Sequence, residues 1–124
     1  MIQGYHLLAD GSGVLSHPGD ILRWLNRAVE VTGLTVIAGP VVDEAHGIGF
    51  VVIAESHISA HIQGARAFID CFSCQPFPWA RVVAAAQDTF GGDWTARYFV
   101  RSRPPSAPRS GRSSAPARVG GHGC

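Results

Sequence analysis

The sequence predicts an α+β fold, a two-layer α/β sandwich in which two helices lie on one face of a largely antiparallel sheet. Hydrophobic residues make up 46% of the 124 residues and charged residues only 15%, which indicates a chain that folds around a core. Two segments show helical spacing of apolar residues, and six show strand-like runs or alternation. Two helices cover one face of such a sheet, so the other face must be solvated or packed against a partner.

Local patterns define each expected element. Strands are expected at residues 5–9, 34–42, 48–54, 56–61, 65–73 and 94–101, and helices at 20–32 and 76–90. Asp20 is the expected N-cap of the first helix, and glycines end both helices, Gly33 the first and Gly91 with Gly92 the second. The stripe of the second helix comprises Trp79, Val82, Val83, Ala86 and Phe90.

The expected strands differ in character. Gly39-Pro40 interrupts the second one, which is typical of a bend or an edge position. Residues 48–54 form a nearly continuous apolar run, typical of a central strand. The next strand alternates, which places His57, Ser59 and His61 on one face.

Charge divides the chain into two parts. Residues 1–101 carry a net charge of −3, whereas residues 102–124 carry four arginines, no acidic residue and a net charge of +4. The second part is almost wholly Ser, Pro, Arg, Gly and Ala and is expected to be a disordered tail after a single domain at 1–101. We interpret the tail as passive or solubilising rather than as a nucleic-acid contact.

Composition also restricts the class of protein. The longest apolar run is strand-sized and the N-terminus shows no signal-peptide pattern, which argues against a membrane or secreted protein. Three cysteines cannot all pair within one chain, so a cytoplasmic location is expected.

Reactive side chains gather in two neighbouring segments, Glu55 to His61 and Asp70 to Cys74. Three readings need no catalysis. A zinc site from His57, His61, Cys71 and Cys74 would require a turn between two cysteines that otherwise point to opposite faces of a strand, so no metal is expected. A redox pair of Cys71 and Cys74 is not expected either, because such pairs normally lie at a helix N-terminus that lowers the thiol pKa. The third reading is a set of hydrogen-bonded polar groups on a half-buried sheet.

The first segment, Glu-Ser-His-Ile-Ser-Ala-His, resembles the self-cleavage signature of the small bacterial S-adenosylmethionine decarboxylase proenzymes. The second, Asp-Cys-Phe-Ser-Cys, resembles the family's downstream Asp-x-Phe-(Ser/Thr)-Cys, and Gly4-Tyr5-His6-Leu7 resembles its opening Gly-x-His-Leu. Pro78-Trp79 resembles the start of the family's second helix. The resemblance covers roughly residues 4–101.

The resemblance implies a pyruvoyl-dependent decarboxylase that processes itself between Glu55 and Ser56. Ser56 attacks the preceding carbonyl, the ester eliminates, and a pyruvoyl group derived from Ser56 remains as the covalent cofactor. Its carbonyl forms a Schiff base with the substrate amine and accepts electrons as CO₂ leaves. His61 is implied as the proton-transfer group for processing and Cys74 as the donor that reprotonates the product. Cys71 has no implied role and is expected to be a small buried residue.

Geometry adds one requirement to the implied roles. Ser56 and His61 are five residues apart, so a flat strand places them on opposite faces, and a bend or twist is needed for them to meet. The resemblance and the uncovered sheet face together predict a homodimer of cleaved protomers, residues 1–55 and 56–124, with active sites near the subunit contact.

Departures from the family pattern leave the substrate open. The Glu expected to bind ribose is absent after His61, and Val42 falls where an aromatic residue would stack on adenine. Ile48 stands where a serine assists processing. S-adenosylmethionine, with spermidine as the downstream polyamine, is the first substrate reading. The alternatives are L-arginine or L-ornithine, with Asp43, Glu44 or Asp70 facing the cationic side chain, and a non-cleaving binding or regulatory subunit.

Overall fold

The computed structural model describes residues 3–54 and 56–102. Its elements follow the predicted order: β1 (Gln3–Ser12), α1 (Asp20–Thr32), β2 (Val36–Asp43), β3 (Ile48–Ile53), β4 (Ser56–Gln63), β5 (Arg66–Ser73), α2 (Trp79–Phe90) and β6 (Asp93–Ser102). Of the predicted tail, Ser102 ends β6 and the remainder lies outside the described residues. Neither described helix is long and apolar enough to cross a membrane.

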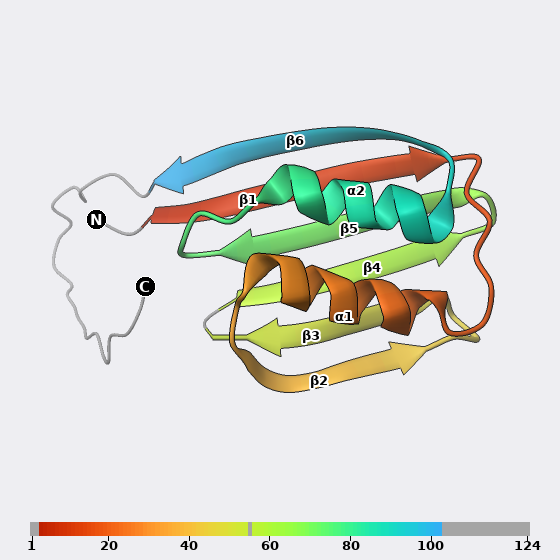
Figure 1. Cartoon of the computed structure of the whole chain (residues 1–124), viewed down its shortest axis with the longest axis horizontal. Helices are drawn as coiled ribbons and strands as arrows, with labels where there is room; N and C mark the ends of the chain where they lie inside the picture. Colours follow the sequence, from red (N-terminus) through yellow and green to blue (C-terminus); the bar gives the residue numbers. More distant parts are fainter. Residues whose placement is uncertain (1–2, 55, 103–124) are drawn as a thin grey trace, which may run out of the picture.

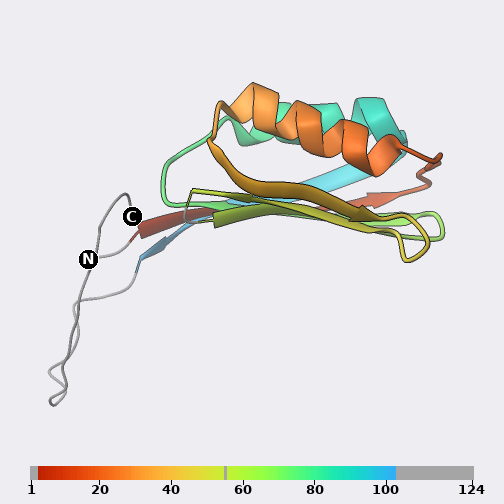
Figure 2. The same ribbon diagram turned by 90° about the horizontal axis from the view of Figure 1, so that it is seen from below.

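The strands form one sheet in the order β2-β3-β4-β5-β1-β6. The chain passes over the sheet through α1 to the far edge, returns strand by strand to β1, and passes through α2 to the other edge (Figure 1). All five strand pairings in the described residues are antiparallel. Both helices lie on the same face and leave the other uncovered (Figure 2), which confirms the predicted α+β sandwich. We call the uncovered side the open face.

Alternation along the strands divides the side chains between the two faces. In β4 the buried residues Ile58 and Ala60 face the helices, whereas His57, Ser59 and His61 lie on the open face, as predicted. The open-face residues of the other central strands are, by register, Ile48, Phe50 and Val52 in β3, Phe68, Asp70 and Phe72 in β5, and His6, Leu8 and Asp10 in β1. The open face therefore combines aromatic and titratable side chains.

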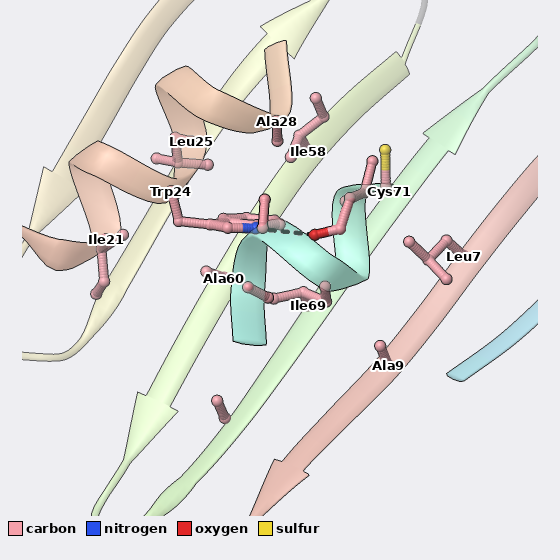
Figure 3. Close-up of a cluster of buried hydrophobic side chains, with 14 of the residues drawn as sticks. Leu7, Ala9, Ile21, Trp24, Leu25, Ala28, Ile58, Ala60, Ile69 and Cys71 are labelled. Carbon is pink, nitrogen blue, oxygen red and sulfur yellow. Dashed lines mark hydrogen bonds between the residues drawn. The ribbon is translucent and has the colours of Figure 1, made fainter. Parts of the chain in front are cut away.

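Trp24 is the largest side chain of the core between the helices and the sheet. It is fully buried, and its Nε1 donates to the backbone oxygen of Val82 in α2 at 3.3 Å (Figure 3). Leu25 and Ala28 extend the same face of α1 above the buried residues of β4. Removing an aromatic side chain of this kind costs about 3–5 kcal/mol in a packed core.

The N-cap of the first helix and the start of the second differ from the prediction. Gly19 is the N-cap of α1, and Asp20 is the first helical residue, where its carboxylate accepts from the His17 backbone nitrogen at 2.8 Å and pairs with Arg23 at 2.8 Å. The second helix begins at Trp79 rather than at residue 76, because a residue that precedes a proline avoids the helical region and Pro78 follows Phe77.

Trp79 was expected on the buried stripe of α2, but it is 37% exposed. The late start of the helix places it in the first turn, where it stacks on Tyr98 of β6 with ring centroids 5.6 Å apart. Val82, Ala86 and Phe90 of the predicted stripe are buried. The predicted edge position of β2 is confirmed, and its pairing with β3 shifts register around Gly39-Pro40.

Candidate active site

Ser56 begins β4 at one end of the sheet. Its pairing partner is Ile53, the last residue of β3, so only Ala54 and Glu55 connect the two strands. The Ser56 side chain is half-buried, and its Oγ lies 3.5 Å from the backbone oxygen of Ala54. The peptide bond predicted to be cut therefore belongs to a two-residue connection between paired strands.

Cys74 lies at the same end of the sheet as Ser56. In the antiparallel pair of β4 and β5, His57 is opposite Phe72, so the first residues of β4 lie beside the last residues of β5. Cys74 follows Ser73, the last residue of β5, and is half-buried. The structure thus brings two of the three predicted catalytic residues to one end of neighbouring strands.

His61 lies on the open face, away from Ser56. It pairs with Ile48 in β3 and Phe68 in β5, and five residues of strand separate it from Ser56 by about 17 Å. Throughout its described length β4 pairs with both neighbours without a register shift. The bend that would bring Ser56 and His61 together is therefore missing from this strand, and one protomer does not unite them.

A hollow of about 360 Å³ opens beside His61 on the open face. Its lining includes Leu8, Asp10, Ile48, Ser59, Phe68, Asp70 and Arg97. Ile48, which stands where the family pattern has a serine, is the direct cross-strand neighbour of His61. A hydroxyl at position 48 would therefore lie next to the imidazole, whereas the isoleucine side chain offers it no hydrogen bond.

Asp70 binds two histidines from neighbouring strands. Its Oδ1 lies 2.8 Å from Nε2 of His6 in β1 and 3.3 Å from Nε2 of His57 in β4. The hydrogen bond that His57 donates to Asp70 raises the pKa of His57, and the hydrogen bonds that Asp70 accepts from His57 and His6 lower the pKa of Asp70. The sequence does not reveal this cluster, because its members are up to 64 residues apart.

Cys71 lies on the helix-facing side of β5 and is fully buried. Burial, followed by the charge of Asp70, raises the pKa of the Cys71 thiol to about 12, so the thiol stays protonated at neutral pH. This confirms the expectation of a small buried residue. His57 and His61 lie on the opposite face, so the four residues considered for zinc do not converge.

The acids considered for a cationic substrate already have partners. Asp43 lies 2.8 Å from His46 Nδ1, and Glu44 accepts from the Gly19 backbone nitrogen at 2.5 Å. Val42, considered for adenine stacking, packs toward Gly49 and the helix-facing core. Aromatic rings lie instead on the open face, where Phe50 and Phe68 are both partly exposed.

Comparison with known proteins agrees with this fold. The family model described as S-adenosylmethionine decarboxylase matches residues 5–102, and the chain belongs to this family of decarboxylases. The crystal structure of the adenosylmethionine decarboxylase from Aquifex aeolicus VF5 is 26% identical and superposes with a TM-score of 0.64. The match covers 90% of this chain and 98% of that one. The search of curated proteins finds no match.

Proposed function

We propose that the chain is a self-processing decarboxylase that cuts itself between Glu55 and Ser56 and acts on S-adenosylmethionine. The observation that carries the proposal is that Ser56 and Cys74 lie at the same end of the neighbouring strands β4 and β5, in a chain that belongs to the family. A nucleophile and a proton donor at a common strand end are what cleavage and product protonation each require.

The position of Ser56 fits a pyruvoyl group formed from that residue. A cut in the connection after β3 leaves the pairing of β3 with β4 intact up to Ile53 and Ser56, so the sheet does not depend on the scissile bond. A pyruvoyl carbonyl condenses with a substrate amine and accepts the electron pair released with CO₂. Cys74 is disulfide-bonded in this structure, so the donor that returns a proton to the substrate carbon would be its reduced thiol at the same strand end.

The separation of Ser56 from His61 supports a homodimer of cleaved protomers. His61 lies on the open face with the partly exposed apolar residues Ile48, Phe50 and Phe68, and exposed apolar groups of this kind mark contact surfaces. Two copies packed through their open faces in opposite strand directions would bring His61 of one near the Ser56 end of the other. In this proposal the partner supplies the proton-transfer group that one protomer cannot.

Two observations favour S-adenosylmethionine over L-arginine or L-ornithine. Asp43, Glu44 and Asp70 are each held by a partner within the chain, so none of the three is available without breaking a contact. The open face carries phenylalanine rings, which can stack on a purine. The proposed product would enter spermidine synthesis, a polyamine pathway.

The test measures release of CO₂ from each of the three substrates by the purified, processed protein. We expect release from S-adenosylmethionine alone. Cys74→Ala should lower the rate by about 100-fold or more. Cys71→Ala removes the buried thiol near the same end of β5 and should leave the rate near the wild-type value. Release from arginine or ornithine alone would overturn the substrate. Release from none of the three would favour a binding or regulatory subunit.

A further inference from the structure

The two imidazoles on Asp70 are part of a longer chain of contacts. Nη1 of Arg101 in β6 lies 3.3 Å from Nδ1 of His6, whose Nε2 lies 2.8 Å from Asp70. A guanidinium only donates hydrogen bonds, so Nδ1 of His6 accepts and the ring proton lies on Nε2, directed at the carboxylate. The contact with His6 of β1 thus fixes the Asp70 carboxylate, which also binds His57 of β4.

Packing restricts the His6 ring as well. Phe72 meets it edge-on and Phe99 lies tilted against it, each with ring centroids 5.4 Å apart. Phe72 also covers Gly4, where an added Cβ would stand 2.3 Å from the phenylalanine ring. A ring held on two sides and hydrogen-bonded at both nitrogens has one orientation, which makes the Asp70 carboxylate a fixed anchor for β4.

His57 directly follows the residue at which the chain is expected to be cut. Once the bond before Ser56 is broken, the covalent link between β3 and β4 is gone, and the first side chain of β4 with an anchor on the neighbouring strand is His57. New chain ends fray unless they are tied down. We propose that Asp70 is a positioning residue that holds His57 and thereby fixes the Ser56 end of β4 during and after self-processing.

The inference rests on the proposed self-processing, and it predicts a definite pH dependence. The charged and titratable groups that face Asp70 are His6 and Asp10 on β1, His57 and His61 on β4, and Arg97 and Arg101 on β6. Since the pKa of His57 is raised, the stability that its contact with Asp70 contributes is fully present below the ordinary pKa near 6.5. This stability is lost as pH rises through the raised pKa. Since the pKa of Asp70 is lowered, the stability that its carboxylate contributes is fully present above the ordinary pKa of 3.8. This stability is lost as pH falls through the lowered pKa.

Two measurements test the role. In the uncut Ser56→Ala background, NMR titration should place the His57 imidazole pKa above 6.5, and Asp70→Asn should return it toward that value. In the wild-type background, the half-time of processing is followed by intact mass across pH. Asp70→Asn and Asp70→Ala should slow processing by about 10-fold to 100-fold and remove the decline of the rate as His57 loses its proton. The exposed Asp88→Asn, on α2, should match the wild type.

The outcomes separate the contact, the positioning role and the proposed function. A His57 pKa at its ordinary value would overturn the contact itself. Slower processing in Asp70→Asn with an unchanged pH profile would indicate a merely structural role and overturn the positioning role. A wild-type chain that never cuts would overturn the proposed function and this role with it, while the titration would still report on the contact.

Discussion

Ile48 and His61 face each other across β3 and β4 on the open face, and this pair decides how fast we expect the chain to process. The family pattern has a serine where isoleucine stands here. An isoleucine side chain neither donates nor accepts a hydrogen bond, so His61 lacks a hydroxyl partner from this position. We therefore expect slow self-cleavage by the natural chain.

Ile48→Ser should accelerate processing by about 10-fold or more, since a positioned proton-transfer partner is worth at least that much. The half-time of cleavage by intact mass at constant pH measures the effect. Val41→Ser, on β2 beside Phe50 and also exposed, is the matched control and should leave the rate unchanged. Equal acceleration by both variants, or by neither, would contradict a specific partnership of position 48 with His61.

At the residue scale, alternation predicted correctly that His57, Ser59 and His61 share a face, because a strand has a strict period of two. The same reasoning could not predict which face of the sheet Val42 lies on. Two register shifts in the pairing of β2 with β3 determine which of its residues face the core. No local pattern in the sequence specifies where such a shift falls.

At the element scale, the two helices are joined through Trp24. Trp24→Phe removes the hydrogen bond to the Val82 oxygen and should lower the free energy of unfolding by about 1 kcal/mol, and Trp24→Ala by about 3–5 kcal/mol. Leu22→Ala, on the exposed side of α1, should change it by less than about 0.5 kcal/mol. Denaturant titration measures all three. A Trp24→Ala protein as stable as Leu22→Ala would refute the packing of α1 on α2.

Element order and helix ends were predictable because glycines and prolines mark them. Gly33 and Gly91 stop their helices where expected. The helix starts were harder to predict. Asp20 is a favourable N-cap residue, yet Gly19 takes that position while the Asp20 side chain bonds to the backbone of His17. The second helix starts later than expected because Pro78 keeps Phe77 out of the helical region.

At the scale of the whole molecule, the open face predicts assembly. Phe50→Glu should convert the proposed dimer into a monomer, because the substitution places a charge in the centre of an apolar contact. Leu22→Glu is the matched control, since Leu22 is 41% exposed and Phe50 40%, on opposite layers. Light scattering at micromolar concentration should give a dimer for the wild type and the control. A monomeric wild type, or dissociation by Leu22→Glu alone, would argue against the open face as the interface.

Sequence alone predicted that two helices leave one sheet face uncovered, since their number limits what they cover. The strand order could not be predicted from the sequence, because long-range pairing places β1 between β5 and β6. That order brings His6, Asp70 and His57 together from three strands. The cluster could therefore be recognised only in the folded molecule.

The intact mass of the protein, followed from purification through a long incubation, tests self-cleavage. Because Ile48 should make self-cleavage slow, we expect the intact chain to convert during incubation into two fragments, residues 1–55 and 56–124, with the second blocked to N-terminal sequencing and Ser56→Ala uncut. A wild-type chain that remains a single species through long incubation would contradict both self-processing and decarboxylation, because the electron sink for decarboxylation would never form.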